Sequence, residues 1–178
     1  MEEDASVRHE YVAGEVYAMT GATRRHNRIA LNIATRLLAV TRGGPCRVYM
    51  EGVRLRAARD VFYYPDVMVA CGPAGDDPLA EHDPCLVVEV LSPATQEIDR
   101  REKALVYKGI ASVRAYLIVH QDVRRVERHW RDDEGTWWHA DTALQGRVPL
   151  PFLDLVLTLD DVYEGLEREG DPTSTTGD

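Results

Sequence analysis

A glutamate lies in the middle of an aliphatic run and needs a chemical explanation. Glu89 has leucines and valines on both sides over residues 86–91, and Ser92-Pro93 ends the run. Removing an ionised carboxylate from water is costly unless the group is paired or binds a metal ion. These residues therefore predict a partner for Glu89, either a cation of the protein or a metal ion.

A second carboxylate stands at the start of another apolar run. Asp66 follows Pro65, whose nitrogen cannot donate a backbone hydrogen bond, and residues 67–70 are Val-Met-Val-Ala. Two acidic residues on neighbouring buried strands supply the oxygen ligands that Mg2+ or Mn2+ requires. We predict that Asp66 and Glu89 converge on one such ion.

A lysine follows on the next predicted element. Residues 94–109 have a helical composition and end in a glycine, and Asp99, Lys103 and Tyr107 are spaced by four residues, which places them on one helix face. Among 21 basic residues, Lys103 and Lys108 alone are lysines. An ammonium can lose its proton when it is buried, whereas a guanidinium effectively cannot, so a lysine at position 103 suggests a chemical role.

The strands that would position these groups follow from the hydrophobic pattern. The run 86–91 reads as a fully covered central strand, with Val87, Glu89 and Leu91 on one face. Further strands are predicted at 46–55, 61–70, 115–119 and 123–130, with Trp137-Trp138 on another strand of the same meander.

Helices and a hairpin complete the predicted elements. Residues 10–19 read as a hairpin around Gly14, in which Glu15 points either at the site or at water. A helix begins after Thr23 and carries His26 in its first turn, where a histidine is either a local hydrogen-bonding residue or a neighbour of the site. Its expected apolar stripe is Ile29, Ile33, Leu37 and Val40, widened by Ala30, Ala34 and Leu38. A short helix is predicted at 159–166.

Length and composition indicate a single compact domain. The chain has 178 residues, of which 44% are hydrophobic and 29% charged. We expect a flexible N-terminus at 1–8, one domain at 9–167 and a disordered acidic tail at 168–178. No secretion signal is evident, and the three cysteines are odd in number and widely spaced, so we expect a cytoplasmic protein with reduced, buried thiols.

The negative net charge of −9 is confined to the two ends. Residues 160–178 contribute −6 and residues 2–4 contribute −3, so the body of the chain is neutral. Arginines gather within it in three groups, each of which is either a solvated face or part of a phosphate track: Arg24, Arg25 and Arg28; Arg54, Arg56 and Arg59; and Arg124, Arg125, Arg128 and Arg131.

Taken together, these motifs resemble the PD-(D/E)xK nuclease superfamily and, more narrowly, the restriction-endonuclease-like Uma-two family. The resemblance spans residues 9–165. It rests on Gly14-Glu15, His26, Pro65-Asp66, residues 86–93, the series Asp99, Lys103, Tyr107 and Gly109, and Tyr116-Leu117-Ile118-Val119.

The resemblance implies an α/β (α+β) fold: a mixed central sheet flanked by helices, with an N-terminal hairpin and an antiparallel C-terminal meander. It implies Asp66, Glu89 and the Val90 carbonyl as ligands of Mg2+ or Mn2+. Leucine stands at position 91, where the superfamily has its lysine, and Lys103 from the next helix would replace it. Glu15, His26, Asp99 and Tyr107 would be accessory residues.

The function that follows is a metal-dependent endonuclease acting on nucleic acid, DNA in the first place, in a protein expected to form a homodimer. In this hypothesis Asp66, Glu89 and Lys103 are catalytic. The leucine at position 91 and the lack of net basic charge favour an alternative, an inactive nucleic-acid-binding or homo-oligomeric assembly module on the same fold. A third reading makes Glu89 structural, paired with Lys103 in a buried ion pair.

Overall fold

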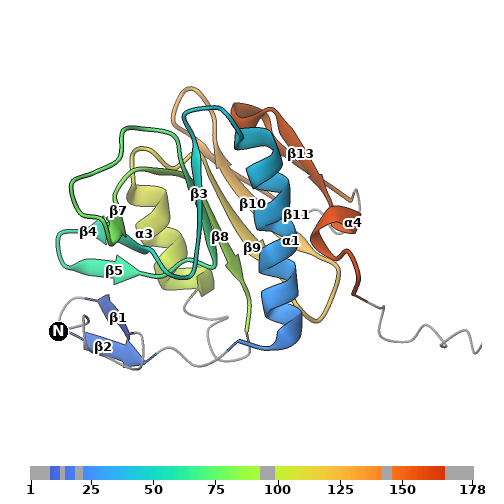
Figure 1. Ribbon diagram of the computed structural model, residues 1–178, viewed down its shortest axis with the longest axis horizontal. Coiled ribbons are helices and arrows are strands. Elements are labelled where there is room, and N and C mark those ends of the chain that lie inside the picture. Colours follow the sequence, from blue (N-terminus) through green and yellow to red (C-terminus); the bar gives the residue numbers. More distant parts are fainter. Residues whose placement is uncertain (1–8, 13–14, 19–21, 93–98, 142–145, 167–178) are drawn as a thin grey trace, which may run out of the picture.

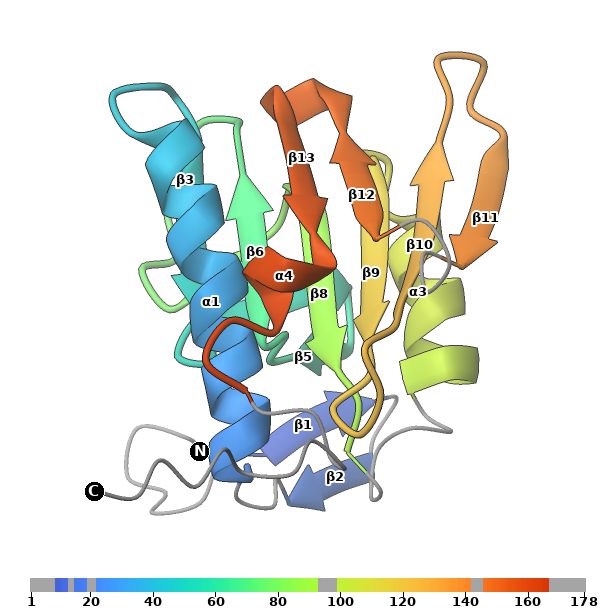
Figure 2. The same cartoon turned by 90° about the vertical axis from the view of Figure 1, so that its right-hand side faces the viewer.

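The computed structural model describes residues 9–12, 15–18, 22–92, 99–141 and 146–166 (Figures 1 and 2). Side chains are described for these residues except 9–12, 15–18, 99 and 100. The segments expected to be flexible or disordered, 1–8 and 168–178, lie outside the described residues. Among the helices of the described part, none has the length and apolar character needed to cross a membrane.

A six-stranded mixed sheet forms the centre of the protein. Its order is β11-β10-β9-β8-β6-β3, in which β8 and β9 run parallel and the other neighbours antiparallel. The strands are β3 (Arg47–Met50), β6 (Val67–Ala70), β8 (Pro84–Val90), β9 (Ala115–Val119), β10 (Val126–Arg131) and β11 (Trp137–Asp141). The predicted mixed sheet and C-terminal antiparallel meander are therefore confirmed.

The central position of β8 explains its aliphatic sequence. All seven of its residues are buried, because β6 and β9 flank it and helices cover both faces of the sheet. Val88 and Val90 pack into the core beside α1, whereas Val87 and Leu91 pack into the core beside α3. The predicted alternation of faces is confirmed, and it directs Glu89 toward α3.

Helix α1 (Arg24–Thr41) covers one face of the sheet (Figure 2). Thr23 caps its N-terminus, since its side-chain oxygen accepts a hydrogen bond from the His26 amide at 3.0 Å. The expected stripe is buried over Ile29, Ala30, Ile33, Ala34 and Leu37, but Leu38 and Val40 are exposed. Leu38 and Val40 lie off the buried face of the helix, whereas Thr41 in its last turn is buried.

Helix α3 (Ala104–Gly109) covers the other face and follows a π-helical turn, η1 (Asp99–Lys103). Its carboxyl end is fixed by the outer strands of the sheet. The Lys108 carbonyl accepts a hydrogen bond from Arg131 Nη2 at 2.8 Å and from Trp137 Nε1 at 3.2 Å. The predicted helix end at Gly109 is confirmed, while residues 93–98 lie outside the described part.

A second sheet of five strands lies on the α3 side, in the order β2-β1-β5-β4-β7. The predicted N-terminal hairpin is present as β1 (His9–Val12) and β2 (Glu15–Ala18), and the remaining strands are β4 (Arg54–Ala58), β5 (Val61–Tyr63) and β7 (Ala80–Glu81). The predictions of single strands at 46–55 and 61–70 were wrong, because each run is divided between the two sheets. Glu51 adopts a positive φ of 39° before Gly52, and Pro65 interrupts the second run.

The C-terminal elements close the α1 side of the sheet: β12 (Arg147–Leu150), η2 (Pro151–Leu153), β13 (Leu155–Thr158) and α4 (Leu159–Val162). Thr158 and Asp161 form a reciprocal capping box at the start of α4. The helix predicted at 159–166 is shorter than expected: it ends at Val162, and a turn follows over 163–165, where Gly165 has a φ of 72°.

The cysteines correct the expectation of three reduced thiols. Cys46 and Cys71 form a disulfide, and Cys85 is the free, buried thiol. Arg47 pairs with Ala70 across β3 and β6, so the residues just outside this pair face each other. The sequence separation of 25 residues gave no indication of this proximity. Cys85 Sγ lies 3.2 Å from Cys71 Sγ.

Candidate functional site

Asp66, directly before β6, and Glu89, on β8, lie at the same end of the sheet. Val67 pairs with Val88 across β6 and β8, so the residue before Val67 and the residue after Val88 are opposite each other. The Asp66 carboxylate accepts a hydrogen bond from the backbone amide of Val90, the residue after Glu89, with Val90 N 2.7 Å from Asp66 Oδ2. This contact fixes the carboxylate beside the end of β8.

His26 reaches the same carboxylate from the first turn of α1. Its Nε2 lies 3.2 Å from Asp66 Oδ2, and the imidazole is buried. Burial lowers the pKa of His26, but the hydrogen bond to Asp66 and the charge of that carboxylate outweigh burial, so the pKa lies above 6.5. The Thr23 cap positions the histidine, because it sets where α1 begins.

Glu51 is a functional candidate that the sequence analysis missed. One ligand atom from each of His26, Glu51 and Asp66 lies within 4.8 Å of the other two. Two carboxylates and an imidazole form a donor set suited to Mn2+ or, with additional waters, Mg2+. The dipeptide Glu51-Gly52 directly after a strand was the available signal, because glycine marks a turn that can present an acidic side chain.

Glu89 belongs to a second group, which faces α3. Its Oε1 lies 3.3 Å from Lys103 Nζ and accepts a hydrogen bond from Tyr107 OH at 2.8 Å. Lys103 and Tyr107 are one helical turn apart, as their spacing predicted. Both side chains are buried with Glu89, so the carboxylate has a hydrogen-bond donor and a cation beside it in the interior.

The surroundings of Lys103 restrict what could replace it. The Tyr63 ring lies 5.3 Å from the ammonium and packs edge-on against Tyr107, with the ring centroids 5.5 Å apart. The lysine side chain is only 5% exposed. A broader guanidinium would displace these rings, which gives a physical reason for lysine in a chain that otherwise uses arginine.

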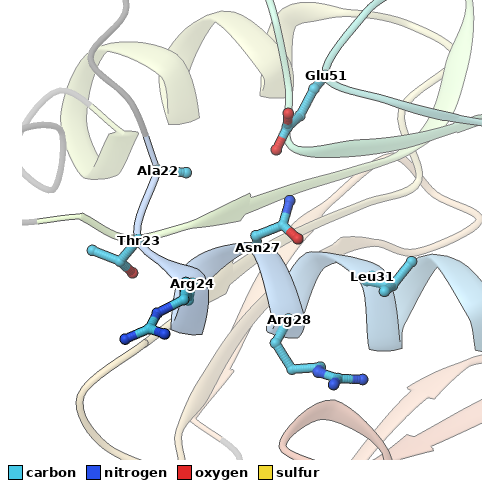
Figure 3. Close-up of a pocket in the computed structure, with 7 residues that line it drawn as sticks. All are labelled: Ala22, Thr23, Arg24, Asn27, Arg28, Leu31 and Glu51. Atoms are coloured by element: carbon cyan, nitrogen blue, oxygen red, sulfur yellow. The ribbon is translucent and has the colours of Figure 1, made fainter.

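A cleft of about 650 Å3 adjoins the acidic group. Figure 3 shows Glu51 pointing across it toward Asn27, with Arg24 and Arg28 extending from the exposed side of α1. Glu51 thus belongs both to the lining of the cleft and to the group that contains Asp66. The guanidinium groups of Arg24 and Arg28 point away from Glu51 in this view.

The structure therefore brings the predicted residues together as two adjacent groups. His26 and Asp66 form one with Glu51, and Lys103 and Tyr107 form the other with Glu89; the Val90 amide connects them through Asp66. The roles predicted for Glu15 and Asp99 depend on side chains that lie outside the described part.

Comparisons with known proteins agree with this fold. Residues 1–160 match the family Uma2, described as "Putative restriction endonuclease". Two relatives come from Synechocystis sp. (strain ATCC 27184 / PCC 6803 / Kazusa). The uncharacterized protein slr1290 is 30% identical over 167 residues, covering 93% of this chain and 88% of that protein. The uncharacterized protein sll1609 is 30% identical over 141 residues, with coverages of 76% and 79%.

A solved structure shares the fold. It is described as a putative nuclease belonging to DUF820 from Anabaena variabilis ATCC 29413. The TM-score is 0.72 with 18% sequence identity, and the match covers 89% of this chain and 90% of that one. The restriction-endonuclease-like architecture expected from the sequence is thereby confirmed.

Proposed function

We propose that this chain, which belongs to the Uma2 family, is a metal-dependent endonuclease. It would hydrolyse phosphodiester bonds, and DNA is the first substrate to test. The observation that carries the proposal is that Glu51 belongs to both the cleft lining and the group of candidate metal ligands. This residue lines a cleft with two arginines and also lies within ligand distance of Asp66 and His26.

The donor atoms fit a divalent ion. We assign Asp66 as its central ligand, with Glu89 and the Val90 carbonyl as the further ligands implied by the family resemblance, and with Glu51 as an additional carboxylate. When bound, Mg2+ or Mn2+ supplies an acidified attacking water and positive charge for the developing pentavalent phosphate.

The residues of the chain divide the remaining tasks. His26 orients the Asp66 carboxylate, because its Nε2 is within 3.2 Å of Oδ2. Tyr107 orients Glu89 in the same way. Lys103 Nζ lies 3.3 Å from Glu89 Oε1, and its ammonium would stabilise negative charge on the phosphoryl oxygens. Arg24 and Arg28 would hold the phosphate backbone along the cleft.

Plasmid nicking tests the assignment. We expect Mg2+- or Mn2+-dependent cutting by the wild type, and its loss in Asp66→Asn and in Glu89→Gln, two substitutions that keep side-chain size. Asp76→Asn, which alters an exposed acid on the loop before β7, is the matched control and should cut normally. Wild-type cutting by both site variants would overturn the proposal, and labelled single-stranded RNA as a parallel substrate distinguishes the nucleic acids.

One observation favours the alternative of a binding or assembly module without catalysis. Glu89 already faces a protein cation, Lys103, in a buried ion pair. This module would bind nucleic acid through the cleft with the same affinity in the wild type and in Glu89→Gln, and neither protein would cut. Electrophoretic mobility shifts measured alongside nicking separate the two functions.

The proposal includes self-association through the edge strand β11. Trp138 on this strand is 53% exposed, and an unpaired strand edge can pair with a second copy. Sedimentation equilibrium should give a dimer mass for the wild type and a shift toward monomer for Trp138→Ser. A wild-type protein that stays monomeric throughout the micromolar range would exclude the dimer.

A further inference from the structure

A second set of metal-ligand side chains lies on the antiparallel ribbon of β10 and β11, on strands other than those of Asp66 and Glu89. Glu127 and His129 are two residues apart on β10 and so share one face, and His139 is the partner of His129 across the ribbon. One ligand atom from each of the three lies within 4.8 Å of the others. The proposed nuclease reaction uses none of them.

The distances between these side chains are close to those between two ligands of one bound ion. Glu127 Oε2 lies 3.9 Å from His139 Nε2, and the two imidazole centroids are 4.5 Å apart. Two ligands of one tetrahedral Zn2+ with bonds of 2.0–2.1 Å are about 3.3 Å apart. His139 is 49% exposed, so its ring has room to rotate and close the difference.

His129 carries an unused ligand atom. Its Nδ1 is buried and has no hydrogen-bond partner within the described part of the chain. Buried ring nitrogens normally have a partner, and a neutral imidazole nitrogen is a common metal ligand. The Tyr116 ring stacks on His129 with the centroids 6.0 Å apart, which fixes the orientation of the imidazole.

Glu127 is held in place by an outer imidazole. Its side chain is 10% exposed, and Oε1 lies 2.7 Å from His120 Nε2. Oε1 also lies 3.8 Å from Arg125 Nη2, and Oε2 is the oxygen that faces His139. Metal ligands are typically oriented in this way by a second hydrogen-bonding group.

We propose that Glu127, His129 and His139 form a second metal site, selective for a transition ion of the Zn2+ class. Two imidazoles and one carboxylate suit Zn2+, Co2+, Ni2+ or Cu2+ better than Mg2+, and three protein ligands leave an open position. The ion would join the edge strand β11 to β10. This inference is independent of the nuclease proposal, since it involves different residues and a different class of ion.

Cobalt titration of the untagged, chelator-treated full chain tests the site, with Co2+ as a spectroscopic substitute for Zn2+. We expect a visible absorption band that saturates near one equivalent and is displaced by Zn2+. His139→Ala should weaken Co2+ binding by about 100-fold or more, since it removes a direct ligand. Asp66→Asn and His82→Ala, which alter the other candidate site and a histidine outside the cluster, should leave the band and its midpoint unchanged.

Several results would overturn the proposal. These are the absence of a saturating band in the wild type, a wild-type midpoint in His139→Ala, and a band that disappears in Asp66→Asn but persists in His139→Ala. The exposure of His139 means that its substitution should not impair folding, which circular dichroism checks. Glu127→Gln provides a second, independent ligand variant, and it should lose the Zn2+-dependent rise in melting temperature that the wild type shows.

Discussion

Lys103 Nζ lies 3.3 Å from Glu89 Oε1, and both side chains are at least 95% buried. A buried charge whose counterion is removed is strongly destabilising, by about 3–5 kcal/mol. We therefore expect Lys103→Met to lower the free energy of unfolding by about this amount. The double variant Glu89→Gln/Lys103→Met should recover most of the loss, because it removes both charges. Urea unfolding of the four proteins gives the coupling energy, and simple additivity would show that the pair does not interact.

His26 provides a pH prediction for the metal-free protein. Burial lowers the pKa of its imidazole, but the hydrogen bond to Asp66 and the charge of Asp66 raise it above 6.5 overall. The contribution to stability is full below pH 6.5 and is lost as the pH rises through the folded-state pKa. Asp66→Asn should lower the pKa and remove this pH dependence. An NMR titration of the histidine rings measures the pKa, with His82 as the internal control, and an unchanged His26 pKa would contradict the assignment.

The three cysteines should differ in reactivity. Burial raises the pKa of Cys85 to about 11, so the native protein should react slowly with a thiol reagent at pH 7. One thiol should react after denaturation and three after denaturation with reductant. Three reactive thiols after denaturation without reductant, instead of one, would argue against the disulfide.

The disulfide should also stabilise the oxidised protein. For a separation of 25 residues the chain-entropy account gives about 3.5 kcal/mol, which reductant should remove in urea unfolding. The matched control is the double variant Cys46→Ser/Cys71→Ser, whose stability should not respond to reductant. An equal response of both proteins would place the effect elsewhere.

The cleft arginines should determine the salt dependence of nucleic-acid binding. Each phosphate contact contributes about 0.9 to the slope of log affinity against log salt. We expect Arg24→Ala and Arg28→Ala each to reduce the slope by about one, measured by fluorescence anisotropy on the Asp66→Asn background. Arg42, exposed beyond the other end of α1, is the matched control. An equal reduction of the slope by Arg24→Ala, Arg28→Ala and Arg42→Ala would indicate that the net charge of the protein, and not contacts in the cleft, sets the salt dependence.

The parts of the fold that the sequence predicted are those with a strong local pattern. The buried run 86–91 could be placed at the centre of the sheet, and its alternation gave the direction of Glu89. The spacing of four between Lys103 and Tyr107 correctly predicted a shared face, and that face meets Glu89. In these cases a few consecutive residues contain the whole physical signal.

The parts that could not be predicted depend on contacts between distant segments. Glu51 lies in a turn, and only folding brings it beside His26 and Asp66. The proximity of Cys46 to Cys71 depends on the register of β3 and β6, which no local pattern reveals. The two runs read as single strands are divided because Pro65 and the positive φ of Glu51 let the chain pass between sheets, an outcome set by packing.

The hydrogen bonds at the carboxyl end of α3 determine how much of the chain is needed to hold the proposed active site together. A fragment ending after β9 would keep both acids, the imidazole and the amine. It would lose Arg131 and Trp137, which hold the Lys108 carbonyl and so fix the helix that carries the amine. Moving only β6 and β8 into another scaffold would therefore not transfer the proposed active site, and the transferred segment would have to extend through β11.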